Sequence, residues 1–197
     1  MTISALVPFL FLSKQGRKKI GITPPASYRW LLYSLVAGTA ISVLLFALGY
    51  ILYDQTLSNW YIYVGRSYNL PEGLGGQDKL VSFIIFATTG MIFSPVGEEL
   101  FFRGIVHSSF AASVREAKAT VIDGLSFALT HLAHFGIVYV SGIWTLLPVP
   151  ATLWVSGMFI TSLVFVACKK KTGSLLGAIL SHAGFNLAMI YFIFYHL

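Results

Sequence analysis

The sequence predicts an all-α, polytopic bundle of transmembrane helices that encloses a polar cavity inside the membrane. Of its 197 residues, 56% are hydrophobic and only 10% are charged, whereas a soluble domain carries about 25% charged residues. The mean hydropathy is +0.78, and several apolar runs reach the roughly 20 residues that a helix needs to cross a bilayer. A few ionisable residues interrupt these runs, and for this reason we expect the enclosed cavity to be polar.

The expected elements follow from the apolar runs and their breaks. Residues 3–12 are too few to span a bilayer and predict an interfacial or partly buried helix. A loop rich in Tyr, Trp and Gly occupies 54–78, after the first span. The stretch 136–150 is interrupted by glycine and proline, and it predicts a short or re-entrant helix. The remaining runs predict five crossings, or six if 136–147 also spans: 30–52, 80–112, 121–135, 152–168 and 174–195.

The formal net charge of +6 indicates a membrane topology rather than a nucleic-acid partner. The basic residues flank the apolar runs, chiefly at Lys14, at 17–19 and at 169–171. This is the positive-inside pattern, in which loop Lys and Arg mark the cytoplasmic side. It predicts a multi-pass protein of the cell membrane, such as a prokaryotic plasma membrane, with a cytoplasmic N-terminus. The lone Cys168 excludes intramolecular disulfides.

Six polar residues fall inside these apolar runs: Glu98, Glu99, Arg103, His131, His182 and Asn186. An ionisable group near the bilayer centre costs roughly 2.5–3.5 kcal/mol, so such groups normally pair or line a wet cavity. We expect these residues to converge around a shared water molecule. They all lie in the second of two parts of the chain. Residues 1–79 hold the interfacial helix, the first span and the aromatic loop, and residues 80–197 form the helical core.

Spacing along the helices suggests partners within this polar set. Glu99 and Arg103 are four residues apart and share a helix face, where they can form a charge-assisted pair. Glu98 points about 100° away from that face. It is left as a desolvated carboxylate, which suits a general base acting on water. The alternative is that all three residues form a buried ion-pair network that only fixes helix packing.

The histidines favour chemistry over a purely structural network. His131 follows Phe127 by four residues and His182 precedes Asn186 by four, so each pair shares a helix face. Alone, a membrane histidine can bond a backbone carbonyl and an asparagine can join two helices. Three separate helices that all present such groups favour a hydrolytic site. The His-Glu-x-x-His and Gly-x-Ser-x-Gly motifs are absent from the sequence.

Three motifs resemble, in order and approximate spacing, those of the CAAX protease and bacteriocin-processing (CPBP, also called Abi) family of intramembrane endopeptidases: Glu98-Glu99-x-x-x-Arg103, Phe127-x-x-x-His131 and His182-x-x-x-Asn186. The surrounding sequence agrees, with Phe-Phe-Arg-Gly at 101–104 and Lys-Thr-Gly-Ser-Leu-Leu-Gly at 171–177. The resemblance covers roughly residues 80–195 and does not extend to the first 79.

The resemblance implies an endopeptidase similar to type II CAAX prenyl proteases, with a peptide or membrane-protein substrate in the lipid bilayer. Glu98 would activate the attacking water with help from His131. His182 and Asn186 would stabilise the tetrahedral oxyanion. The supporting residues would be Glu99, Arg103 and Phe127, and His134 has no assigned counterpart.

The sequence is compatible with two mechanisms of hydrolysis and with a second function. Glu98, His131 and His182 are an acceptable zinc ligand set that leaves one position for water. Alternatively, the glutamate acts as a base without a metal, which we favour, and no other cofactor is expected. The alternative function is a non-proteolytic bacteriocin-immunity or peptide-binding membrane protein. A proton-coupled transporter is disfavoured by the short chain and the lack of repeat symmetry.

Overall fold

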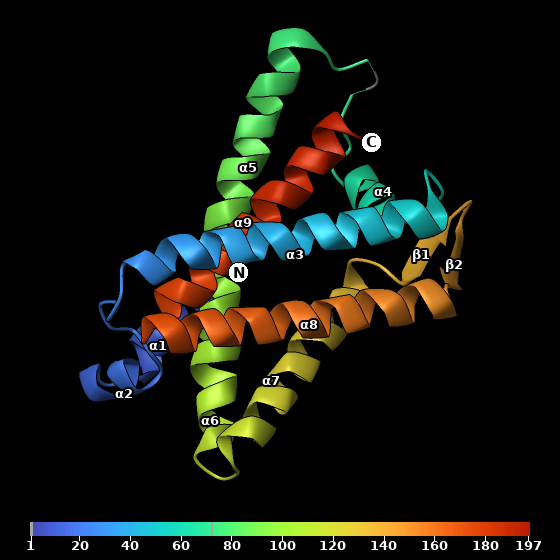
Figure 1. The fold of residues 1–197 in the computed structure, drawn as a ribbon. Helices are drawn as coiled ribbons and strands as arrows, with labels where there is room; N and C mark the ends of the chain where they lie inside the picture. The colour runs from blue at the N-terminus through green and yellow to red at the C-terminus, as the bar shows by residue number, and fades with distance from the viewer. Residues whose placement is uncertain (1, 72) are drawn as a thin grey trace.

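A computed structural model describes residues 2–71 and 73–197, and it confirms the predicted all-α bundle (Figure 1). Its helices and strands are, in chain order, α1 (Thr2–Phe11), α2 (Lys14–Lys19), α3 (Arg29–Tyr53), α4 (Trp60–Arg66), α5 (Gly76–Glu99), the π-helical segment η1 (Leu100–Val106), α6 (His107–Ala111), α7 (Glu116–Thr130), the 3₁₀ turn η2 (His131–Ala133), β1 (Ile137–Val140), β2 (Ile143–Leu146), α8 (Pro148–Thr172) and α9 (Leu175–Tyr195).

Four helical segments in the described part of the chain are long and apolar enough to cross a membrane: Arg29–Tyr53, Gly76–Ala111, Pro148–Thr172 and Leu175–Tyr195. The fifth crossing, expected over 121–135, is not among them. That region forms α7, whose 15 residues extend about 22 Å at 1.5 Å per residue. The hydrocarbon core of a bilayer is about 30 Å thick, so α7 alone does not cross it.

The expected short or re-entrant helix over 136–150 is wrong for residues 137–146. This stretch forms an antiparallel hairpin of β1 and β2, with Val140 paired to Ile143 across the turn. The two turn residues, Ser141 and Gly142, have φ values of +51° and +84°, as a two-residue hairpin turn of this hand requires. Tyr63 of α4 anchors the hairpin, because its hydroxyl accepts a 2.9 Å bond from the Tyr139 amide.

Helix α9 lies at the centre of the bundle and packs against α3, α5 and α8. Small residues recur every four positions on the buried face of α3, at Ser34, Gly38 and Ser42. A Cβ added at Gly38 would collide with the backbone carbonyl of Ser181 in α9. Small residues at such intervals let two membrane helices approach at backbone distance. The close approach of α3 and α9 therefore depends on Gly38.

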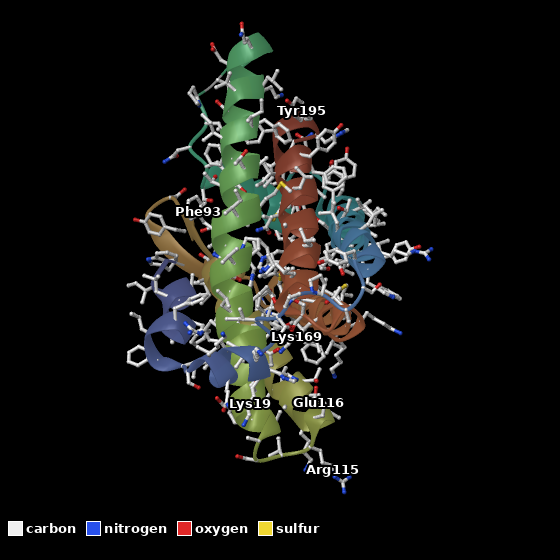
Figure 2. The ribbon with its side chains drawn as sticks, turned by 90° about the vertical axis from the view of Figure 1, so that its left-hand side faces the viewer. Lys19, Phe93, Arg115, Glu116, Lys169 and Tyr195 are labelled. Atoms are coloured by element: carbon white, nitrogen blue, oxygen red, sulfur yellow. The ribbon has the colours of Figure 1, made fainter. Side chains whose placement is uncertain are left out.

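Three basic residues from separate segments lie toward one end of the molecule (Figure 2). In that view Lys19, Lys169 and Arg115 lie in the lower half, whereas Tyr195, at the end of α9, lies near the top. Segments far apart in the sequence thus present their cations on the same side, which is the distribution that a positive-inside topology produces.

We expect Gly38→Val to destabilise the bundle, because its side chain would force α3 away from the Ser181 carbonyl. Overpacking of a well-packed core typically costs about 1–3 kcal/mol. The matched control is Ala40→Val, at an exposed position of the same helix. Thermal melting of both variants in detergent measures the difference. Equal melting temperatures would show that α3 and α9 do not meet at Gly38.

Candidate active site

One cavity, with a volume of about 280 Å³, is lined by the four residues expected to act on a substrate. Glu98 comes from the end of α5, His131 from the turn η2 that follows α7, and His182 and Asn186 from α9. Phe127 lines the same cavity. The structure therefore brings the polar groups of three separate segments around one space.

The two glutamates lie where α5 passes into η1. Glu98 and Glu99 are the last two residues of α5, and the π-helical segment Leu100–Val106 follows directly. π-Helical turns within a helix occur frequently at functional sites. Glu98 is 5% exposed and lines the cavity. The hydroxyl of Ser94, one turn earlier in α5, donates a short hydrogen bond to its carboxylate.

Arg103 is a fully buried cation that connects two helical segments and the aromatic core. Its Nε lies 3.1 Å from Oε2 of Glu99, the partner that the spacing predicts, and 3.7 Å from Oδ2 of Asp123 in α7. Its guanidinium also stands 4.1 Å from the ring centroid of Phe127 and 5.3 Å from that of Phe165. Cations over aromatic faces gain electrostatic stabilisation that grows when water is excluded.

Asp123 is a site residue that the sequence interpretation missed. None of the three sequence motifs includes it. A usable signal was nevertheless present, because Asp123 precedes Phe127 by four residues and His131 by eight. That spacing places all three near one face of a helix. Three further contacts of the site have no comparable signal in the sequence. They are those of the Ser94 hydroxyl with Glu98, of the Phe165 ring with His182, and of the Trp154 indole N–H, which donates to the His131 carbonyl at 3.0 Å.

A hydrogen bond at Nδ1 orients each of the two histidine rings, and Nε2 is the ring nitrogen that takes no part in that bond. His131 Nδ1 lies 2.7 Å from the carbonyl of Phe127, and His182 Nδ1 lies 2.8 Å from Oε1 of Glu99. Both partners are acceptors, so each Nδ1 carries a proton and donates it. The His182 ring stacks on Phe165 at a centroid distance of 4.8 Å. A carboxylate or carbonyl bonded to one ring nitrogen determines the tautomer and orients the ring.

Asn186 and Tyr68 add hydrogen-bond donors to the cavity. Nδ2 of Asn186 donates to the carbonyl of Gly90 at 2.8 Å, which connects α9 to α5. An amide carries two N–H donors, so the second one remains for a ligand. Tyr68 lines the same cavity. Burial raises the pKa of the Tyr68 hydroxyl to about 12, so this group keeps its proton at neutral pH.

The arrangement gives no support to the zinc ligand set considered from the sequence. Glu98, His131 and His182 share the cavity. Across residues 2–71 and 73–197, however, no group of three or more His, Cys, Asp or Glu side chains is placed to hold a metal ion. The metalloprotease interpretation therefore gains no support from the geometry.

Replacing Arg103 by alanine should leave Glu99 and Asp123 buried without a counter-charge. Removing one partner of a buried ion pair is typically destabilising by about 3–5 kcal/mol. We expect a markedly lower melting temperature in detergent. Arg115→Ala, at an exposed position just before α7, should melt like the parent protein. If the two variants melt alike, the buried charges do not depend on Arg103.

Comparison with known proteins agrees with the motifs. Residues 80–188, more than half of the chain, match the family model described as Type II CAAX prenyl endopeptidase Rce1-like. No curated protein and no solved structure matches the chain. The matched region contains all three motifs, from Glu98 to Asn186, and the resemblance read from them is confirmed. The chain belongs to the Rce1-like type II CAAX prenyl endopeptidase family.

Proposed function

We propose that this protein is an intramembrane endopeptidase that hydrolyses a peptide bond with a water molecule activated by Glu98. The observation that carries the proposal is the shared cavity, where a buried carboxylate, two oriented imidazoles and an amide surround one space. Membership of a CAAX-type protease family supports the same reaction class. Residues 80–197 would form the catalytic core in this account.

In the first step, Glu98 accepts a proton from water while the water oxygen bonds to the carbonyl carbon of the scissile bond. His131 assists, because Nε2 carries no proton when Nδ1 donates to Phe127, and it can accept a hydrogen bond from the same water. A positioned general base of this kind typically contributes about 10²–10⁴-fold to the rate.

The carbonyl oxygen becomes negatively charged in this step and requires donors. The second N–H of Asn186 is one donor. His182 is the other when its imidazole carries a proton at Nε2 as well as at Nδ1, and the Glu99 carboxylate, 2.8 Å from Nδ1, orients the ring. Donors that are already in place when charge develops stabilise the transition state without reorganisation.

The tetrahedral intermediate then collapses. The bond between the carbonyl carbon and the amide nitrogen breaks, and Glu98 returns its proton to the leaving amine. The products are one peptide that ends in a carboxylate and one that begins with an amine. Glu99, Arg103 and Phe127 act indirectly, since Arg103 holds Glu99 and stands over Phe127, and Glu99 holds His182.

The four apolar helices make this a multi-pass membrane protein. We place it in the cell membrane with the end that carries Lys19, Lys169 and Arg115 in the cytoplasm, because these cations come from separate segments and lie toward the same end (Figure 2). The N-terminus would lie on that same side. The substrate would be a peptide or the peptide segment of a membrane protein that reaches the cavity within the bilayer.

Glu98→Gln should abolish turnover while leaving the fold intact, because glutamine keeps the shape of the side chain and cannot accept the proton. We expect a loss of at least about 100-fold in kcat on an internally quenched hydrophobic peptide in detergent, in line with the contribution of a general base. Glu116→Gln, at an exposed position, is the control and should retain full activity. Undiminished turnover by Glu98→Gln would refute the proposed mechanism.

We further propose that the glutamate acts without a metal ion. Purified, active protein should then keep its activity in EDTA and in 1,10-phenanthroline, and elemental analysis should find zinc well below one atom per chain. Thermolysin, a zinc protease, assayed in the same buffers controls for the chelators. One zinc per chain, with activity lost to the chelator and restored by zinc, would contradict this.

A further inference from the structure

A second cavity, of about 340 Å³, also borders the proposed catalytic base. Glu98, His131 and His134 line both cavities. The remaining lining of the second cavity is different and includes Ser4 of α1 and Phe101 of η1. The base and its neighbouring histidines therefore lie between two separate spaces, each of which borders Glu98.

The two cavities extend toward different helices. The first is bounded by Val64 of α4 and by Ser67 and Tyr68, which follow that helix. Helix α4 packs against α9 and α3. The second is bounded by α1, which packs against α5 and η1. Both bounding helices lie before residue 80, outside the stretch that matches the family. The part of the chain that the family match does not cover therefore supplies walls to each cavity.

Helix α1 is held against the catalytic segment by apolar contacts. Ala5 and Leu12 pack on the cluster that contains Ile20 and Leu100, the residue that follows Glu99. The opposite face of α1 is apolar and open, with Ile3 81% exposed and Leu10 72% exposed. In a membrane protein such a face contacts lipid, as in interfacial helices. Helix α1 thus separates the second cavity from the bilayer.

The lining of the second cavity suits uncharged peptide. Phe101 and Phe102 supply apolar surface, and Ser4, Thr130 and His134 supply groups that can hydrogen-bond a peptide backbone. Among the described residues that line it, none is a Lys or Arg, and Glu98 is the only carboxylate. Its volume falls in the range of roughly 300–1,000 Å³ that is usual for ligand sites.

We propose that the second cavity is the subsite for uncharged substrate residues on one side of the scissile bond, and that α1 forms its outer wall. This inference rests on the proposed function, since it assigns a part of the same substrate. Ser4 limits how large that part can be, because among the α1 side chains that the structure describes it is the one that lines the cavity. The segment on the other side of the scissile bond occupies the first cavity.

The test converts Ser4 into a chemical handle. The chain has one native cysteine, Cys168, which is buried, so Ser4→Cys introduces a single accessible thiol. Ile3→Cys, on the exposed face of the same helix, is the matched control. Each folded variant is modified with a small and then a bulky methanethiosulfonate, and intact mass spectrometry verifies complete modification. Because the thiol is modified after folding, a folding defect cannot imitate the effect.

Turnover is measured on two internally quenched, uncharged peptides that the parent protein cleaves, one extended by leucines before the scissile bond and one extended after it. The bulky adduct on Ser4→Cys should lower kcat/KM at least fivefold for one of the two peptides and leave the other nearly unchanged. The small adduct should have a weaker effect, and modified Ile3→Cys should behave like the parent. An equal loss on both peptides, a loss in both variants, or no loss in either would overturn the subsite assignment.

A binding measurement separates this inference from the proposed function. Uncharged peptides extended by leucines on either side of their centre are first tested for binding in the Glu98→Gln background, whether or not the parent protein cleaves them. One of the two should slow modification of Ser4→Cys several-fold and leave that of Ile3→Cys unchanged. Protection without any turnover by the parent protein would support the subsite while refuting the endopeptidase. Turnover by the parent protein without protection would support the endopeptidase and refute the subsite.

Discussion

The architecture of the site depends on one buried positive charge. The guanidinium of Arg103 lies fully buried between the carboxylates of Glu99 and Asp123, which are themselves buried. A charge in such a place is tolerated only when it is paired. Glu99 in turn accepts the Nδ1 proton of His182, so the ionic contact extends from η1 to α7 and α9. The orientation of His182, a proposed catalytic residue, thus depends on Arg103, to which we assign no contact with substrate.

Helix packing supplies the second constraint. Helix α9 presents Ser181 and Gly184 to the backbone of α3, while His182 and Asn186 line the cavity and bond to α5 and its C-terminal glutamate. The small residues that let α3 approach therefore also determine where the polar face of α9 can lie. The change from α-helix to π-helix at Leu100 ends α5 directly after its two glutamates. Glu98 lines the cavity there, and Glu99 binds Arg103.

Much of the fold and part of the site could be predicted from residue spacing. The apolar runs predicted α3, α8 and α9 to within a few residues, and the four-residue spacing predicted the Glu99–Arg103 pair. The hairpin at 137–146 was missed because a short apolar stretch with β-branched residues has no periodicity that separates strand from helix. The bond from Glu99 to His182 spans 83 positions of sequence, and no local pattern encodes such a distant contact. Asp123 continues the four-residue spacing of Phe127 and His131, but its contact with Arg103 joins two different helical segments and has no local pattern.

The central claim is that Glu98, His131, His182 and Asn186 surround one water-accessible space. The most direct measurement is an experimental structure of the protein in a lipid nanodisc, at a resolution that shows ordered water. We expect the Glu98 carboxylate and both imidazoles to face the same cavity, with a water molecule hydrogen-bonded to Glu98. We also expect His182 Nδ1 to donate a hydrogen bond to Glu99. The claim would be contradicted if Glu98 turned toward lipid. It would also be contradicted if Glu98 lay more than about 9 Å, or three hydrogen-bond lengths, from both imidazoles.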